Sequence, residues 1–424
     1  MEKNERKGDK MPGSKGSLNL LTKNRNFLLL FFGRLVSSVG TAIFFISILW
    51  SAATEIGGVA AVSAILSTVA VVNIIFSPFA GVWADRWKKR NILVITDITC
   101  GVILLLLGSF FGTYLFQIWV LILAIFGLQI CGSLFGPALL SLIPVIADDK
   151  DLFQANALIS MTDRLSQIIG MAIGGVLISL VGIKGAIFID AITFILSAVS
   201  EMFINIEEIN KKEVKTHKKI RMWPDIKDGF KVIWSNIELK WLILLEIIAD
   251  FFGTTIFVFL PILADQILKV DSAGYGIMQA MLGVGSLISA LVLSFVKEIK
   301  MKYTALTIAG ILSGLSLMSL GIANRYLYAL FSLLILGIMS EIVNVNENLI
   351  IQRRTPKDTR GRVFALRSTM DNSLRPFSFA LAGVLATIFP LQNIFIVFGL
   401  ISSIIGLMYI FIPIRLKKQE IAVD

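Results

Sequence analysis

Two acids lie four residues apart in an apolar stretch of the sequence, Glu246 and Asp250 in the run WLILLEIIADFFG. This spacing places both carboxylates on one face of a helix. Because neighbouring acids repel each other and an apolar environment disfavours charge, we expect one of them to hold a proton near neutral pH. Binding and releasing a proton inside an apolar segment is the chemistry that a proton carrier requires.

Other charged residues also lie inside apolar segments. Arg367, Asp371 and Arg375 repeat at intervals of four residues, so this stripe can balance its own charges and present Arg375 inward. Arg34 and Glu341 lie in two further apolar runs. A charge at the centre of a bilayer costs at least about 2.5–3.5 kcal/mol. Each of these groups must therefore pair, become neutral or face a polar cavity.

The chain as a whole has the composition of a membrane protein. Of its 424 residues, 56% are hydrophobic and 16% are charged, whereas a soluble domain carries about 45–50% apolar and about 25% charged residues. These values exclude a soluble globular protein and a disordered chain, and only two cysteines exclude a disulfide scaffold. The net charge of +10 fits basic loops facing anionic lipid. We expect no nucleic-acid partner.

The sequence carries none of the common catalytic or metal-binding motifs. It has no G-x-x-x-x-G-K-[ST], G-x-S-x-G, H-E-x-x-H or C-x-x-C pattern. The single histidine, His217, lies among lysines, and Cys100 and Cys131 fall inside apolar runs. We therefore expect neither an enzyme nor a metal or cofactor site.

The apolar runs predict twelve membrane-spanning helices, since a span needs about 20 residues. The first 25 residues are polar and basic and contain no cleavable apolar region, so we do not expect them to act as a signal peptide. The predicted spans are 26–50, 58–82, 91–112, 115–138, 153–181, 183–205, 239–264, 274–296, 303–323, 326–349, 364–388 and 391–414.

The connections between these spans alternate in charge. Basic residues gather at 86–90, 297–302, 353–362 and 415–418, whereas the connections on the other side are nearly free of charge. The positive-inside rule then places both termini and the middle loop in the cytoplasm. We expect a multi-pass protein of the cell (cytoplasmic) membrane.

The two halves of the chain resemble each other. Residues 142–158 and 350–366 both run from an apolar helix end through a polar Asp-Lys or Lys-Asp turn into a new helix. Parallel repeats of six spans predict two bundles related by an axis along the membrane normal, with substrate between them near the midplane. The expected parts are a tail at 1–25, bundles at 26–205 and 239–414, a linker at 206–238 and a tail at 415–424.

The later part of the linker, RMWPDIKDGFKVIWSN, predicts an amphipathic helix. Ile226, Phe230 and Ile233 fall on one helical face. Such a helix can lie on the inner leaflet of the membrane or pack against the ends of the bundles, and both can hold at once.

The run GVWADRWKKR at 81–90 resembles the signature G-x-x-x-D-R-x-G-R-R/K of the major facilitator superfamily. Four of its residues match the signature, and Trp87 and Lys88 depart from it around the second glycine. The resemblance implies an all-α membrane protein with twelve transmembrane helices in two pseudosymmetric six-helix bundles. The matching residues, which form the gating motif of that family, are Gly81, Asp85, Arg86 and Arg90.

Three finer runs are similar to the drug-exporter branch that includes macrolide efflux proteins and the enterobactin exporter. They are L-I-P…L-x-x-A-N-A-L at 142–158, I-D-A-I-T-F at 189–194 and R-G-R-V-F at 360–364. The branch exports amphipathic molecules, commonly by proton antiport. Its antiporter motif is partly present as GMAIGG, in which Met171 replaces a proline, and Leu128 stands where an arginine is frequent.

The resemblance also suggests roles for individual residues. Spans one, four, seven and ten line the central cavity in that family, so the charged residues of these spans become cavity candidates. A static network of ion pairs between the bundles is the alternative. The proton-coupling candidates are Asp250, Glu246 and Glu341, and the substrate-cavity candidates are Arg34, Asp371 and Arg375.

Two further sets of residues concern movement. Asp85 can cap a helix N-terminus and pair with a basic residue of span eleven only when the cytoplasmic ends of the bundles meet, which would favour an outward-open state. Alternatively, Asp85 simply ends span two. Gly170, Gly174 and Gly175 have the spacing that lets helices approach closely, with or without sliding.

The favoured function is proton-driven export of a small amphipathic molecule, macrolide-like or drug-like, by a monomer in contact with lipid. The alternatives are a siderophore or lysophospholipid exporter or flippase, a uniporter without proton coupling, and a receptor that does not transport. Arginines would suit an anionic substrate and acids a cationic one, so the sequence leaves the sign of the substrate open.

Overall fold

The computed structural model describes residues 20–113, 118–148, 151–205, 222–295, 302–356 and 359–412. Residues 1–19 and 415–424 of the expected tails, and His217 of the expected linker, lie outside these ranges. The N-terminal half contains α2 (Arg25–Ser51), η1 (Ala52–Ile56), α3 (Gly58–Arg86), α4 (Lys89–Phe110), α5 (Ile118–Ile146) and α6 (Leu152–Met202).

A short helix, α7 (Met222–Ser235), precedes the C-terminal half. That half contains α8 (Ile237–Gly253), α9 (Ile256–Ile262), η2 (Leu263–Ile267), α10 (Ser272–Phe295), α11 (Lys302–Gly321), α12 (Tyr326–Arg354), α13 (Arg360–Ile388), α14 (Leu391–Met408) and η3 (Tyr409–Phe411).

The described helices provide twelve crossings of a membrane. Ten helical segments are long and apolar enough to span a bilayer in the part of the chain that the structure describes. One of them, α6, contains two crossings, because Gly182 adopts φ +70° and breaks the helix in the middle of its 51 residues. The twelfth crossing is α13, whose charged residues lower its hydropathy. The predicted number of spans is confirmed.

Several helices extend beyond the predicted spans. Helix α5 continues through Pro144 to Ile146, and α12 continues to Arg354. A hydropathy window marks the part of a helix that lies in hydrocarbon, whereas backbone hydrogen bonds continue into the polar zone until a cap or turn ends them.

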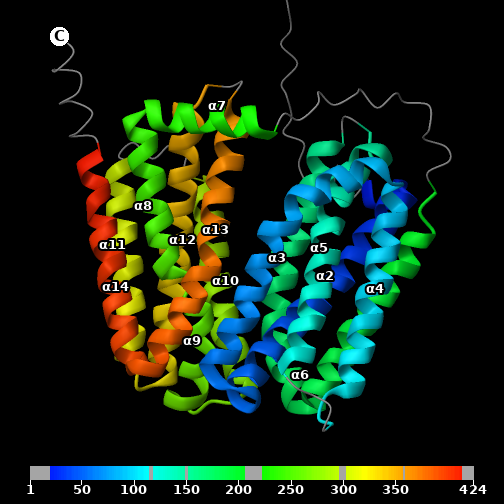
Figure 1. Cartoon of the computed structure of the whole chain (residues 1–424), viewed down its shortest axis with the longest axis horizontal. Helices are drawn as coiled ribbons and strands as arrows, with labels where there is room; N and C mark the ends of the chain where they lie inside the picture. Colours follow the sequence, from blue (N-terminus) through cyan, green and yellow to red (C-terminus); the bar gives the residue numbers. More distant parts are fainter. Residues whose placement is uncertain are drawn as a thin grey trace, which may run out of the picture.

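The helices form two six-helix bundles that repeat the same packing (Figure 1). In the first bundle, α3 and α4 both pack on α5, and α4 also packs on α6. In the second, the corresponding helices α10 and α11 both pack on α12, and α11 also packs on α14. Between the bundles, α3 contacts α13 and α10 contacts α6. A pseudo-twofold axis exchanges α3 with α10 and α13 with the first part of α6, so it relates these two contacts to each other. The predicted architecture is confirmed.

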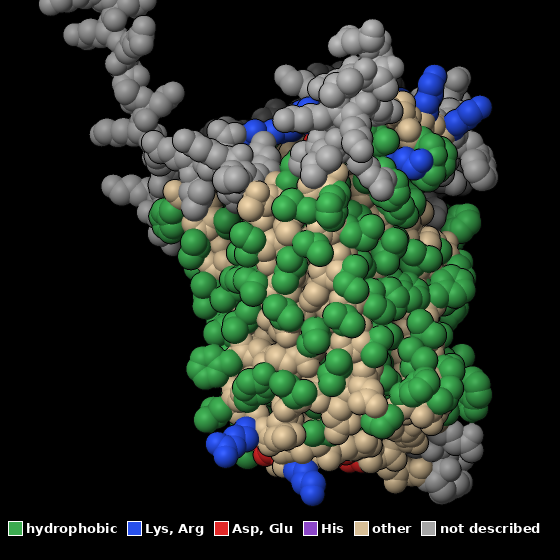
Figure 2. Space-filling view, turned by 90° about the vertical axis from the view of Figure 1, so that its left-hand side faces the viewer, with side chains coloured by type: hydrophobic (Ala, Val, Ile, Leu, Met, Phe, Trp, Pro, Cys, Tyr) green, Lys and Arg blue, Asp and Glu red, His purple; other side chains and the backbone are tan. Residues whose placement is uncertain are grey.

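A belt of apolar side chains covers the outside of the bundles. Figure 2 shows hydrophobic side chains over the middle of the molecule and Lys and Arg side chains toward its two ends. Large residues such as Leu123 and Phe331 are 70% and 65% exposed in this belt. Exposed apolar surface of this extent fits contact with lipid acyl chains.

Helix α7 differs in part from the predicted amphipathic helix. It packs against α8 and α13 at one end of the second bundle (Figure 1). Ile233 is buried, as expected for its apolar face, but Phe230 is 45% exposed. The predicted helix is present, and its packed face is centred on Gly229 and Ile233, whereas Phe230 lies outside that face. The side chain of Ile226 lies outside the description.

The two bundles contact each other toward the end away from α7 (Figure 1). The hydroxyl of Ser272 donates a 3.0 Å hydrogen bond to the backbone carbonyl of Gly175, and the ring of Trp50 stacks on that of Tyr275. A Cβ on Gly175 would lie 2.4 Å from the carbonyl oxygen of Ser272 and 2.9 Å from the Cα of Gly276. The small residue is therefore required for this close approach. Gly170 and Gly174, by contrast, pack against α2 inside the first bundle.

We expect Gly175→Val to hold the bundles apart at this end. Overpacking of a tight contact costs about 1–3 kcal/mol, which shifts a two-state population by about 5- to 150-fold. A Ser272→Cys reporter, with Cys100 and Cys131 replaced, should then react faster with a membrane-impermeant maleimide. Gly136→Val is the control because a Cβ there meets nothing within 4 Å. Equal labelling rates in both variants would contradict the expectation.

Candidate functional site

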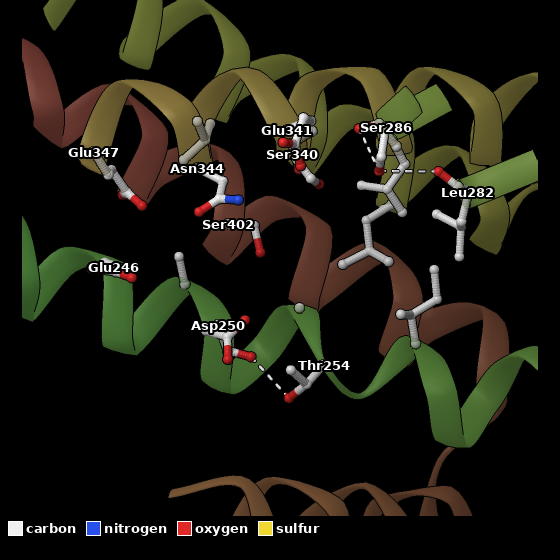
Figure 3. Close-up of a pocket in the computed structure, with 18 of the residues that line it drawn as sticks. Glu246, Asp250, Thr254, Leu282, Ser286, Ser340, Glu341, Asn344, Glu347 and Ser402 are labelled. Atoms are coloured by element: carbon white, nitrogen blue, oxygen red, sulfur yellow. Dashed lines mark hydrogen bonds between the residues drawn. The ribbon is translucent and has the colours of Figure 1, made fainter. Parts of the chain in front are cut away.

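A cavity of about 700 Å³ lies between the two bundles. Most of its lining comes from the second bundle, and Gln167, Ile168 and Met171 of α6 contribute the facing wall. Figure 3 shows Glu246 and Asp250 on α8 facing Glu341, Asn344 and Glu347 on α12. A cavity of this size, with an apolar lining and a few polar groups, is typical of a small-molecule site.

The cavity wall carries more negative than positive groups. Five carboxyl and two guanidinium groups line it, which gives a formal charge of −3 if every group is ionised. The excess negative charge must be balanced by protons, by bound cations or by a positively charged ligand. The charged lining residues are Glu246, Asp250, Glu341, Glu347, Asp371, Arg367 and Arg375.

Arg367 of α13 holds Glu246 of α8 in a two-point contact. Its Nε lies 2.7 and 2.8 Å from the two carboxylate oxygens, and its Nη1 donates to Asn348 at 2.6 Å. Its Nη2 also lies 3.8 Å from Glu347, whose carboxylate accepts a 2.6 Å hydrogen bond from the hydroxyl of Tyr409. The sequence left a static ion pair as the alternative to proton transfer. Glu246 forms such a pair with Arg367.

Arg375 is shared between two carboxylates. Its Nη2 lies 2.9 Å from Asp371 on the same helix and 3.5 Å from Asp250 on α8. One positive charge cannot balance two negative ones, so a further positive charge is favourable in this group of three. Asp250 makes the longer of the two contacts and is the less tightly held acid.

The helix that carries Asp250 is broken just after it. Helix α8 ends at Gly253 and α9 begins at Ile256, and the hydroxyl of Thr254 donates a 2.9 Å hydrogen bond to the backbone carbonyl of Asp250. The hydroxyl of Ser378 on α13 contacts this turn through Thr254 at 3.2 Å. Discontinuous helices next to charged groups are a common feature of substrate and ion sites in transporters.

Glu341 is the cavity acid without an ion pair in the described part of the chain. It lies on α12 and lines the cavity together with Ser340 and Asn344 (Figure 3). No arginine or lysine of the described residues lies within ion-pair distance of its carboxylate, in contrast to Glu246 and Asp250. Glu341 is thus placed to meet a positive group of a ligand.

Arg34 lies apart from the cavity lining. Its Nε contacts Asp163 of α6 at 2.9 Å, and its guanidinium lies 5.3 Å from the ring centre of Phe135. Both contacts are inside the first bundle. The structure therefore brings together Glu246, Asp250, Glu341, Asp371 and Arg375, and it does not bring Arg34 to them.

The residues of the gating motif lie at the end of α3 and the start of α4. Gly81, Asp85 and Arg86 occupy the last turns of α3, and their side chains lie outside the description. Arg90 of α4 donates a hydrogen bond to the backbone carbonyl of Met202 at the end of α6. Helix α3 contacts α13 of the other bundle nearer its start, at Ser63 and Ser67, and the motif lies at the far end of this helix.

Two residues of the site were not expected from the sequence. Glu347 is buried between Arg367 and Tyr409, and Tyr409 itself is 2% exposed. Glu347 lies six residues from Glu341 in a polar stretch of α12, which was a usable signal. Nothing in the sequence connects it with Tyr409 of η3, because that contact depends on how α12 and η3 are placed relative to each other.

The chain matches the model of the Major Facilitator Superfamily over residues 30–378 and 306–423. It is similar to the uncharacterized MFS-type transporter YfiS of Bacillus subtilis, with 26% identity over 92% of this chain and 93% of the relative. It is also similar to the multidrug efflux pump Tap of Mycolicibacterium fortuitum (22% identity, 95% and 98% covered). A third relative is macrolide efflux protein A of Streptococcus pyogenes (20%, 92% and 97% covered).

The fold agrees with solved structures. The chain superposes on the nucleoside transporter NupG with a TM-score of 0.74 at 12% identity, over 91% of this chain and 98% of the other. The twelve helices in two repeating bundles, the cavity between them and the match over nearly the whole sequence agree with one another. This chain is a membrane transporter rather than an enzyme, and it belongs to the Major Facilitator Superfamily.

Proposed function

We propose that this protein exports small amphipathic molecules across the cytoplasmic membrane in exchange for protons. The observation that carries the proposal is the shared arginine: Asp250 and Asp371 compete for Arg375 in the wall of the cavity between the bundles. A proton on Asp250 satisfies this group of three, and so does a cationic group of a substrate. Because either one can supply the missing positive charge, binding of one disfavours the other, which is the requirement for antiport.

The shape and lining of the cavity support an amphipathic substrate. Apolar side chains such as Ile168, Phe257 and Leu282 line it beside the charged groups. A molecule with a greasy body and one polar or basic group would match both parts of this surface. The two relatives named as a multidrug efflux pump and a macrolide efflux protein support the same reading.

The cavity favours a basic group over an anionic headgroup. An anion would need a free guanidinium, but Arg367 and Arg375 are already paired with carboxylates. Glu341 offers an acid without an ion pair among the described residues. Export of an anionic siderophore or a lysophospholipid is therefore the second choice, and it would require Arg375 to exchange Asp371 for the substrate.

The purified protein in proteoliposomes tests the proposal. Cationic dyes, macrolides and siderophores are offered with and without an imposed pH gradient. We expect the gradient to drive accumulation of a dye or macrolide, and substrate addition to move protons the other way. Accumulation that ignores the gradient would support a uniporter instead, and a response to siderophores alone would support the anionic alternative.

We expect Glu341→Gln to separate substrates by charge. Removing an unpaired acid from the cavity should weaken export of a cationic dye by about 10- to 150-fold, since a charge-assisted contact contributes about 1.5–3 kcal/mol. Export of an uncharged analogue should change little. Dose–response curves for the two substrates measure the difference. An equal loss for both would show that Glu341 supports the fold rather than the substrate.

We further propose that the α7 end of the molecule faces the cytoplasm and that Asp85 forms a latch there. The bundles contact each other at the opposite end, so the latch with α13 would form only in the other state of the cycle. A latch needs to contribute only a few kcal/mol to shift a two-state population.

Asp85→Asn should therefore leave expression and folding unchanged but slow export severalfold. Transport per molecule in proteoliposomes, normalised to protein content, measures this effect. Asp148→Asn, a change in another polar turn, is the control. Wild-type transport by Asp85→Asn would show that Asp85 only ends the helix.

A further inference from the structure

Helix α7 shows an exposed face of mixed lysines and aromatic rings. Lys227, Phe230, Lys231 and Trp234 follow the spacing i, i+3, i+4, i+7, which places them along one side of the helix. All four are exposed. The opposite side, with Gly229 and Ile233, is buried against the second bundle.

The aromatic residues of this face form an ordered group. The rings of Phe230 and Trp234 stack with centroids 4.4 Å apart and an angle of 15° between their planes. The ammonium of Lys240, at the start of α8, lies 4.8 Å from the ring centre of Trp234. Phe230 and Trp234 are nevertheless 45% and 49% exposed, so their outer faces are open to a partner.

The position of α7 indicates which partner this is. The helix lies across the end of the second bundle, where the apolar belt gives way to polar and basic residues (Figures 1 and 2). Aromatic rings and lysines at this level are the combination that binds the headgroup region of a membrane with anionic lipids.

The buried side of α7 touches the helix that carries the cavity arginines. A Cβ on Gly229 would lie 3.0 Å from the carbonyl oxygen of Arg362, in the first turn of α13. Arg362 lies only five residues before Arg367, which holds Glu246. A shift of α7 therefore displaces the backbone of α13 directly, with no flexible side chain between them.

We propose that the face formed by Lys227, Phe230, Lys231 and Trp234 docks on anionic phospholipid headgroups, and that this docking fixes the first turn of α13 through the contact of Gly229 with Arg362. The lipid composition of the membrane would then set the position of the arginine stripe in the cavity wall. The docking step does not depend on what the protein transports or on whether protons drive it.

Fluorescence quenching by brominated lipids tests the docking. The full-length protein is placed in bilayers of phosphatidylcholine and phosphatidylglycerol, and either lipid is brominated in turn. The chain has seven tryptophans. The fluorescence of Trp234 is obtained by subtracting the signal of the same protein with Trp234→Phe, both for the wild type and for each lysine variant. We expect brominated phosphatidylglycerol to quench Trp234 more strongly than brominated phosphatidylcholine does. Lys227→Gln with Lys231→Gln should reduce this preference for phosphatidylglycerol by up to about 30-fold.

The matched control is Lys184→Gln with Lys269→Gln, which removes the same charge from exposed lysines of α6 and of the segment after η2. It should leave the preference unchanged. Equal quenching by both lipids in the wild type, or a preference that survives the loss of Lys227 and Lys231, would overturn the docking.

Hydrogen exchange of the amides at 360–364 tests the second step. We expect slower exchange in bilayers with phosphatidylglycerol than in phosphatidylcholine alone. Gly229→Leu should abolish this difference while Trp234 still prefers the anionic lipid, because the larger side chain separates α7 from α13. Exchange that is independent of the lipid in the wild type would overturn the coupling of α7 to α13.

Discussion

Asp250→Asn should abolish gradient-driven export and leave downhill movement of an uncharged substrate intact. The amide resembles a carboxyl group that carries a proton permanently, so it satisfies Arg375 and Asp371 in every step of the cycle and has no proton to release. We expect accumulation in proteoliposomes to fall to the level of protein-free vesicles, whereas counterflow of a labelled uncharged substrate without a gradient continues.

The control for this experiment is Asp265→Asn, which changes an acid of the same span that does not line the cavity. It should retain gradient-driven export. A protein with Asp250→Asn that still accumulates substrate against a gradient would remove Asp250 from the proton pathway. The remaining acids of the cavity are Glu246, Glu341, Glu347 and Asp371.

Arg367→Gln should destabilise the protein strongly. It leaves Glu246 without its ion pair in a site where the two side chains are only 16% and 12% exposed. Removing one partner of a buried ion pair typically costs about 3–5 kcal/mol, since the other charge stays buried alone. We expect a much shorter half-life of the folded protein in detergent at raised temperature, measured by the loss of its monodisperse peak in size-exclusion chromatography.

Two comparisons identify the cause of this loss. Glu246→Gln combined with Arg367→Gln should recover much of the half-life, because two amides can bond each other without a buried charge. Arg34→Gln, which breaks the more exposed pair with Asp163, should cost only about 1 kcal/mol or less. If the double variant were as short-lived as Arg367→Gln alone, the packing of the arginine would be the cause rather than the charge pair.

Periodicity and charge predicted the parts of the site that lie on one helix. The interval of four residues placed Glu246 beside Asp250 on α8 and made a stripe of Arg367, Asp371 and Arg375 on α13. These patterns depend only on helix geometry, which is the same in every sequence. The number of spans followed from the apolar runs, and the division into two halves followed from the similarity of residues 142–158 to 350–366.

Contacts between helices could not be predicted in this way. Arg367 and Glu246 are 121 residues apart, and their pairing depends on the rotation and depth of α8 relative to α13. Arg34 shows the consequence: its span was expected to face the cavity, but the side chain turns to Asp163 inside the first bundle. The break after Asp250 was also hidden, since Gly253 and Thr254 are unremarkable residues in a membrane helix.

We propose that the cavity changes sides as Asp250 gains and loses a proton. Distances between paired spin labels test it most directly, in a protein whose buried Cys100 and Cys131 have been replaced. One pair, at Trp87 and Gln352, reports the α7 end, and another, at Glu55 and Asn324, reports the opposite end; all four positions are exposed.

Changing the pH should shorten one distance and lengthen the other in the wild type, and should leave both fixed in Asp250→Asn. The two distances must change in opposite directions because closing one end of the cavity opens the other. Distances that ignore pH in the wild type, or that respond equally in Asp250→Asn, would contradict the account.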